Sequence, residues 1–357
     1  MLWGPPEAVV RASGSGTTLR LDANGAALLG ITVDGSGGRF DLLDAAVRVE
    51  ADDVRVEGVT VRNALFGLLV EKSHRVQLLD NTVLGDATKP LGMRGDGIRL
   101  WEVRDSHIEG NHLSDSRDLV VWYSPGNEFV GNDIERSRYG THFMYSHDSL
   151  VRASRFNGNV VGIFIMYSRG IELRQNRITE SSGAAGVGLG AKESGNLVVA
   201  DNLFAGNSIG VYLDTSPLDF ADQNRFERNA FRFSDTAVVF HGGADRNAFF
   251  DNSFRDNQSQ VGVEGRGDAM DAEWRRNDFD DYAGYDLDGD GFGDIAYELR
   301  NLSDQLIARH PELAFFRGSA ALGLVSVIGR IVPLFQPRTL LVDPQPRMGP
   351  YRGPHES

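Results

Sequence analysis

The stretch Thr141–Gly170 reads THFMYSHDSLVRASRFNGNVVGIFIMYSRG and contains nearly the same phrase twice. FMYS at positions 143–146 returns as IMYS at positions 165–168, a step of 22 residues. Each copy ends a short run of alternating apolar residues, the pattern of a β-strand whose successive side chains face opposite sides. A strand that recurs at this step predicts a solenoid of stacked strands.

The same step runs through most of the chain. Short apolar units recur at steps of 22, 30, 21, 22, 22, 26, 27 and 23 residues, with outlying copies at Ile31 and Asn277. Their equivalent positions are Val59, Asn81, Asn111, Asn132, Ser154, Asn176, Asn202, Asn229 and Asn252. Two or three short strands per repeat predict an all-β fold, a parallel β-helix of about ten coils. The recurring Asn side chains are expected to stack as an amide ladder inside a turn.

Alternation along one strand of each coil predicts which side chains point outward. One outward column contains Trp101, Trp122, Met144, Met166, Lys192 and Asp214. The neighbouring column contains Arg99, Val120, His142, Phe164 and Tyr212, and we expect Val238 and Phe240 to face outward as well. Exposed Trp, Met and Phe in a row are unusual on a solvated surface. The stripe is therefore covered by another segment, binds a protein, or binds a soft metal.

Thioether sulfur prefers Cu(I), and imidazole joins it readily. Met144, Met166, His142 and His147 are accordingly candidate ligands for transiently bound copper.

Composition narrows the classes of partner. The 357 residues include no cysteine, which excludes disulfides and thiolate metal sites. A net charge of −14 argues against a nucleic-acid partner. The first residues, MLWGPPEAVV, lack the basic start and apolar core of a signal peptide, so the chain is either cytoplasmic or already trimmed. No uninterrupted apolar run is long enough to predict a membrane span.

The segment DLDGDGFGD begins at Asp286. Asp286, Asp288, Asp290 and Asp294 occupy positions 1, 3, 5 and 9 of a calcium-type loop, but Tyr297 replaces the expected Glu at position 12. The loop predicts either a structural calcium or another hard cation, or a turn that holds no ion.

We divide the chain into a β-helix (1–280), this Asp/Gly-rich loop (281–296) and a C-terminal tail (297–357). Apolar residues at helical spacing from Leu299 to Ile307 predict a partly helical tail. Such a tail is expected to cap the open end of the solenoid. Its segment 313–335 is also apolar enough to lie against a membrane or a membrane protein, and capping alone is the alternative.

Carbohydrate binding or turnover is the competing interpretation. Asp96, Asp118 and Asp214 flank the outward face and are the candidate catalytic carboxylates, while Trp101 and Trp122 would be platforms for sugar rings.

Several motifs together resemble the NosD family. They are RGDGIRLW (94–101), the doubled MYS, YAGYDLDGDGFGDIAYELRNLSDQL (282–306) and PRTLLVDPQPRM (337–348), and the resemblance extends from Ala27 to Met348. It implies a right-handed parallel β-helix in the periplasm with no enzymatic activity of its own. It also implies docking on an ABC transporter of permease and ATPase subunits, and contact with the membrane only through that transporter.

The family resemblance further implies a part in building the copper–sulfur centre of nitrous oxide reductase, with a copper chaperone lipoprotein as donor. We expect the two methionines, with His142 or His147, to exchange Cu(I) where the chaperone docks. The surrounding docking surface is expected to consist of Trp101, Trp122, Phe164, Lys192, Tyr212 and Asp214. A purely structural adaptor, whose stripe binds protein and never metal, is the third interpretation.

Overall fold

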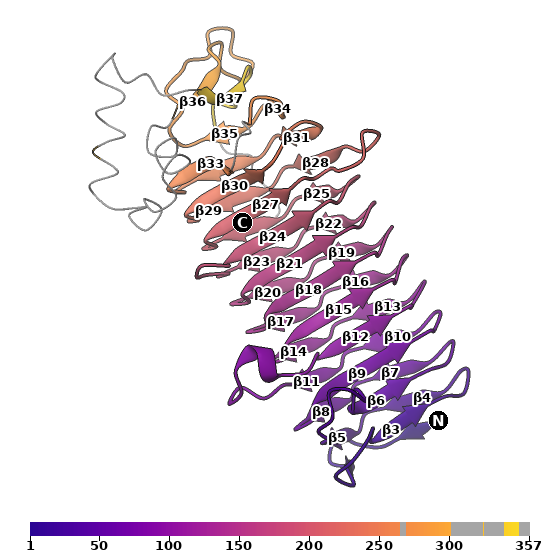
Figure 1. Ribbon diagram of the computed structural model, residues 1–357. Helices are drawn as coiled ribbons and strands as arrows, with labels where there is room; N and C mark the ends of the chain where they lie inside the picture. Colours follow the sequence, from indigo (N-terminus) through magenta and orange to yellow (C-terminus); the bar gives the residue numbers. More distant parts are fainter. Residues whose placement is uncertain (265–268, 301–323, 325–338, 350–357) are drawn as a thin grey trace.

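The computed structural model describes residues 1–264, 269–300 and 339–349, together with Leu324. Its strands stack into a long rod that begins at the N-terminus (Figure 1). Three parallel sheets run along the rod, with 12, 12 and 11 strands, and every third strand joins the same sheet. This confirms the parallel β-helix, with twelve coils where the sequence predicted about ten.

The sheets are composed as follows. The first contains β1 (Leu2–Trp3), β4 (Ala27–Leu29), β7 (Arg55–Glu57), β10 (Gln77–Leu79), β13 (His107–Glu109), β16 (Glu128–Val130), β19 (Leu150–Arg152), β22 (Glu172–Arg174), β25 (Val198–Ala200), β28 (Asn224–Glu227), β31 (Asn247–Phe250) and β34 (Glu273–Arg275). The second contains β2 (Val9–Arg11), β5 (Thr32–Asp34), β8 (Thr60–Arg62), β11 (Thr82–Leu84), β14 (His112–Ser114), β17 (Asp133–Glu135), β20 (Arg155–Asn157), β23 (Arg177–Thr179), β26 (Leu203–Ala205), β29 (Ala230–Arg232), β32 (Ser253–Arg255) and β35 (Asp278–Phe279). The third contains β3 (Leu19–Leu21), β6 (Ala45–Val49), β9 (Phe66–Glu71), β12 (Ile98–Trp101), β15 (Asp118–Trp122), β18 (Tyr139–Met144), β21 (Val161–Met166), β24 (Val187–Lys192), β27 (Ile209–Asp214), β30 (Thr236–His241) and β33 (Ser259–Glu264). A short 3-10 helix, η1 (Leu91–Met93), lies in the loop between β11 and β12.

One continuous apolar core fills the rod from end to end. Its aromatic rings stack between coils, as Phe226 does on Phe249 at 4.6 Å and Phe249 on Trp274 at 4.3 Å. Burial of this apolar surface is the main force that holds the coils together.

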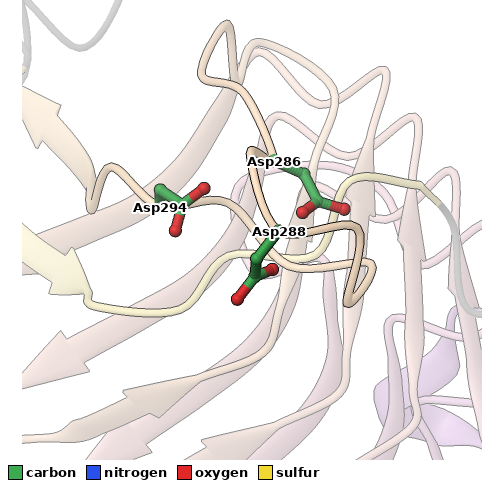
Figure 2. Close-up of side chains that lie close together, drawn as sticks. All are labelled: Asp286, Asp288 and Asp294. Atoms are coloured by element: carbon green, nitrogen blue, oxygen red, sulfur yellow. The ribbon is translucent and has the colours of Figure 1, made fainter.

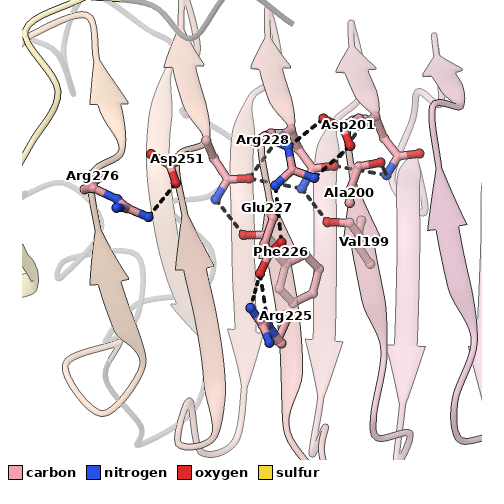
Figure 3. Close-up of polar contacts among 12 residues, drawn as sticks. Val199, Ala200, Asp201, Arg225, Phe226, Glu227, Arg228, Asp251 and Arg276 are labelled. Atoms are coloured by element: carbon pink, nitrogen blue, oxygen red, sulfur yellow. Dashed lines mark hydrogen bonds and ion pairs between the residues drawn. The ribbon is translucent and has the colours of Figure 1, made fainter. Parts of the chain in front are cut away.

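The predicted Asn ladder is present, and Ser154 bridges the two parts of it through hydrogen bonds to Asn132 and Asn176. The backbone N–H and side-chain amide of Asn202 both donate to Asn229 Oδ1, each at 3.0 Å. Asn229 repeats this contact on Asn252, and its Nδ2 also donates to the Val199 carbonyl at 2.8 Å. Ion pairs beside this part of the ladder join neighbouring coils, and Figure 3 shows Arg228, whose Nε lies 2.8 Å from Asp201 Oδ1. The ladder supplies hydrogen-bond partners for backbone N–H and C=O groups that are buried away from water.

A second column explains the serine of the repeated MYS. The Ser146 N–H donates to Ser168 Oγ at 3.0 Å, and the Ser124 N–H donates in the same way to Ser146 Oγ. These serines are buried, so the repeated MYS marks a structural corner of the coil as well as an outward methionine.

The last coil is covered by an antiparallel pair, β36 (Tyr297–Arg300) and β37 (Thr339–Asp343). The prediction of helix from Leu299 onward is wrong at its start, because residues 297–300 form a strand, whereas Leu324, the one described residue between 301 and 338, is helical. Tyr297 and Leu299 alternate as buried residues with exposed neighbours, and the Tyr297 ring stacks on Phe279 at 3.9 Å. The remainder of the predicted helical tail, including segment 313–335 apart from Leu324, lies outside the described residues. Within the described part of the chain, no helix is both long and apolar enough to span a bilayer.

Candidate functional site

The strand register confirms the predicted outward column. Trp101 pairs with Trp122, Trp122 with Met144, and Met144 with Met166 on successive strands of the third sheet. The column continues through Lys192 and Asp214. Neighbouring strands of a sheet stand about 4.8 Å apart, so the two methionines are direct neighbours on the outside of the rod.

The second column contains Val120, His142, Phe164, Gly190 and Tyr212 in register. A Cβ atom on Gly190 would stand 2.4 Å from Phe164 Cδ2, so this glycine makes the room in which the Phe164 ring lies.

The predicted outward orientation of Val238 and Phe240 is wrong. Val238 pairs with Val211 and Phe240 with Leu213, and both are buried in the core. Residues 237–240 are all apolar, so this strand has no alternation of apolar and polar side chains that would distinguish its inward face from its outward face. His241 takes the outward place beside Asp214.

His142 is the most enclosed polar group of the stripe, with 6% of its surface exposed. Its Nε2 lies 3.3 Å from Met166 Sδ, and the Trp122 indole N–H donates to its Nδ1 at 3.4 Å. Tyr139, which the sequence reasoning did not select, packs its ring against the imidazole at 4.9 Å between centroids. Burial lowers the pKa of His142 to about 4, so the ring is neutral at physiological pH.

His147 stands apart from this group. It lies beyond the corner that follows Met144, and its Nδ1 accepts the backbone N–H of Arg169 at 3.1 Å. Among the described residues, no hydrogen bond or ring contact joins it to Met144, Met166 or His142. The structure therefore brings His142 and the methionines together and places His147 elsewhere.

Tyr123, Tyr145 and Tyr167 form a ladder along the same corner, and the sequence reasoning missed it. Their rings stack at 5.3 and 5.0 Å. All three have positive φ (53°, 49° and 51°), which is rare for a bulky residue. Tyr123 and Tyr145 remain over 40% exposed. The repeated MYS could have predicted this ladder, because its tyrosine recurs at equivalent corners and equivalent corners of successive coils stack.

Buried ion pairs lie at the beginning of the same strands. The Asp96 carboxylate accepts from Arg99 Nη1 at 3.1 Å and from Arg117 Nε at 2.9 Å. Asp118 accepts from Arg138 Nε at 3.0 Å. Both carboxylates are fully buried, and burial raises the pKa of Asp96 despite its two Arg partners. These buried carboxylates and their arginine partners therefore stabilise the beginnings of the strands.

Arg99 connects this charged network to the aromatic stripe. Its guanidinium carbon lies 5.4 Å from the Trp101 ring centroid and 4.9 Å from that of Trp122. Because Asp96 holds the guanidinium, Arg99 fixes both indoles through cation–π contact.

The far end of the stripe is polar. Lys192 Nζ pairs with Asp214 Oδ2 at 3.4 Å, and Tyr212 donates its hydroxyl to Glu264 Oε2 at 3.0 Å. Burial, reinforced by the Glu264 charge, raises the pKa of Tyr212. The stripe thus changes from soft and aromatic to charged within two coils.

The Asp/Gly-rich loop brings three of its four predicted ligands together. Figure 2 shows Asp286, Asp288 and Asp294, whose carboxylate oxygens lie within 4.8 Å of one another. Asp290 is not in this group, and its Oδ1 accepts the Phe292 N–H at 2.8 Å. The predicted calcium ion stays a prediction.

The donor atoms at His142 and Met166 suit a soft cation. Nitrogen and sulfur ligands of one small metal ion stand about 2.0–2.3 Å from it, so they lie about 3–4 Å from each other. The 3.3 Å between Nε2 and Sδ falls in that range, and Met144 adds a second thioether on the adjacent strand. No thiolate or carboxylate is in contact with these atoms among the described residues, so the set favours Cu(I) over hard ions.

Comparisons with known proteins agree with the sequence resemblance. A family model described as "Periplasmic copper-binding protein (NosD)" matches residues 83–284. A Pseudomonas aeruginosa protein named "Probable ABC transporter binding protein NosD" is 29% identical over 350 residues, covering 90% of this chain and 77% of the relative. A protein of the same name from Stutzerimonas stutzeri is 27% identical over 348 residues, covering 93% and 78%.

Among solved structures, the catalytic domain of an α-1,3-glucanase matches with a TM-score of 0.48 at 13% identity, covering 76% of this chain and 60% of that one. A periplasmic alginate epimerase matches with a TM-score of 0.45 at 14% identity, covering 74% and 69%.

Proposed function

The chain belongs to the NosD family, and we propose that it is a periplasmic accessory protein that docks on an ABC transporter and carries copper toward the copper–sulfur centre of nitrous oxide reductase. Its partners are the permease and ATPase subunits, a copper chaperone lipoprotein and the reductase itself. The membrane is reached only through the transporter.

The observation that carries this proposal is the contact of His142 Nε2 with Met166 Sδ, beside a second methionine. Two thioethers and one neutral imidazole hold Cu(I) without thiolates. Such a set binds copper weakly enough to release it to the next site. Cu(I) is here the cargo, and the residues that bind it are Met144, Met166 and His142.

The aromatic residues around these ligands support a docking role. Trp101, Trp122 and the Tyr123–Tyr167 ladder present large, half-exposed rings that are fixed by stacking and by Arg99. Rigid aromatic residues of this kind supply most of the binding energy at protein interfaces. We propose that the chaperone contacts this surface, so that its copper reaches the methionines directly.

We also propose that the chain catalyses no reaction of its own. The carbohydrate interpretation needs accessible carboxylates, but Asp96 and Asp118 are buried and held by arginines. The third candidate, Asp214, is paired with Lys192. These pairings support a binding role over glycosidic bond cleavage.

The test is Cu(I) binding by the purified protein, alone and with the copper chaperone, in the wild type and in Met144→Leu/Met166→Leu. Leucine keeps the volume and removes only the sulfur, so the fold and the docking surface are retained. Met93→Leu is the matched control, because this methionine is 59% exposed and lies in the η1 loop.

We expect the double variant to lose copper binding while the control keeps it. Equal binding by the double variant and the wild type would show that the ligands lie elsewhere. No binding by any form, with or without the chaperone, would leave the stripe as a docking surface only.

A further inference from the structure

Trp122 has two roles at once in this structure. Its ring lies in the exposed stripe where we propose that a partner docks, and its indole N–H donates to His142 Nδ1 at 3.4 Å. The Trp122 and His142 rings meet edge to face, with centroids 5.5 Å apart. The residue that a partner would touch is therefore hydrogen-bonded to the candidate copper ligand.

This hydrogen bond fixes where the His142 proton sits. A neutral imidazole carries one proton, and a nitrogen that accepts a hydrogen bond is the unprotonated one. Because Nδ1 accepts from Trp122, the proton is on Nε2, which lies against Met166 Sδ at 3.3 Å. The lone pair that a metal ion would need is then on the wrong nitrogen.

We propose, on the basis of the proposed copper function, that Trp122 latches His142 in a tautomer that cannot bind copper, and that a partner which displaces the indole opens the latch. With the indole moved away, Nδ1 takes up one proton while Nε2 releases one to water, so the net charge of the ring is unchanged. The freed Nε2 lone pair then forms a bond to Cu(I) already held by the two thioethers. No electron is transferred in this step.

The latch gives copper exchange a direction. While the partner is docked, copper has three ligands and binds more tightly. When the partner leaves, the Trp122 hydrogen bond re-forms, the nitrogen ligand is withdrawn, and copper is bound only by weak thioethers. By thermodynamic reciprocity, copper bound to His142 must also strengthen docking of the same partner.

The surroundings of His142 suit a hydrogen-bond latch. Tyr139, Phe164 and Trp122 pack their rings around the imidazole, which leaves little water to compete for Nδ1. Arg99 in turn lies over the Trp122 ring, 4.9 Å from its centroid, and holds the indole in place. The closed arrangement is thus the ground state of the isolated protein.

The experiment uses Trp122→Phe, which keeps an aromatic ring and removes only the N–H donor. Trp3→Phe is the matched control, because Trp3 is an exposed indole of β1 that lies outside the stripe. Long-range proton–nitrogen correlation spectra of ¹⁵N-histidine-labelled, copper-free protein report the His142 tautomer directly. Cu(I) affinity without any partner is measured in the same variants, and again in a His142→Gln background.

We expect the wild type and Trp3→Phe to show a proton on Nε2 alone, and Trp122→Phe to show a shift toward Nδ1. Cu(I) affinity should rise about fivefold in Trp122→Phe, the factor that one net hydrogen bond of about 1 kcal/mol represents. This gain should vanish when His142 is replaced by Gln.

A wild-type proton on Nδ1, or a tautomer unchanged by Trp122→Phe, would overturn the latch whatever copper does. The predicted tautomers together with copper binding that is unaffected by Trp122→Phe would overturn its role in copper exchange. Absence of copper binding in every form would instead overturn the proposed function, and the latch with it, while the spectra would still establish the hydrogen bond.

Discussion

Asp343 ends the Asn ladder, and replacing it with Asn tests how the rod is closed. Its Oδ2 accepts the Asn277 backbone N–H and side-chain amide, both at 2.9 Å. Its Oδ1 accepts the backbone N–H groups of Arg276 and Gln345, at 3.2 and 3.0 Å. Four donors thus converge on one carboxylate at the end of the stack.

In Asp343→Asn, an amino group replaces one oxygen, so two of the four donors lose their acceptor in either orientation of the amide. Each buried donor left unpaired costs about 1–3 kcal/mol, or about 2–6 kcal/mol for two. Burial raises the pKa of Asp343, so removing its charge recovers part of this cost. We therefore expect a net destabilisation of the last coil by about 2–4 kcal/mol.

The assay is native-state hydrogen exchange. Terminal coils of a solenoid open separately from the middle, so the Asn277 amide should exchange about 30-fold faster or more in the variant. The Asn132 amide, in the middle of the rod, should keep its rate. Asp41→Asn, an exposed carboxylate near the N-terminus, is the control. Unchanged exchange at Asn277 in Asp343→Asn would refute the capping argument.

Three further predictions follow from the site and the loop. Folded His142 has a pKa of about 4 against 6.5 for an ordinary histidine, so the stability from its neutral form is complete above pH 6.5 and falls by about 3 kcal/mol as the pH drops to 4. Urea unfolding of the wild type and His142→Gln across that range checks this, and the same loss in both would contradict it. Gly190→Val should cost about 1–3 kcal/mol by displacing the Phe164 ring, and Phe164→Ala in the same chain should restore stability in thermal unfolding. Millimolar Ca²⁺ should raise the Tm of the wild type but not that of Asp286→Asn/Asp294→Asn, and equal shifts would argue against a calcium site.

The fold and the main column were predictable because both depend on a regular step. Each coil must return to the same place, so residues 22 apart around Met144 and Met166 had to become neighbours. The Asn ladder follows from the same regularity, and the structure confirms its amide contacts.

Other features depend on contacts that no periodicity encodes. The Arg99 contacts with Asp96 and the indoles join side chains of different columns and were invisible in the strand pattern. The separation of His147 arises at a corner, where the chain turns onto another sheet. The error at Leu299 arose because its segment is short enough to fit a helical or a strand period.

The parallel stack of strands has one more consequence, which concerns timing. Backbone hydrogen bonds above and below hold the strands of Trp122, Met144 and Met166, so these Cα positions cannot approach or separate without breaking the ladder. The backbone of the rod is therefore rigid, and copper exchange on it depends on rotation about side-chain bonds. Such rotations take picoseconds to nanoseconds at exposed positions, far faster than domain closure. The rate of copper transfer would then be set by binding and release of the partner, and not by fluctuations of the rod.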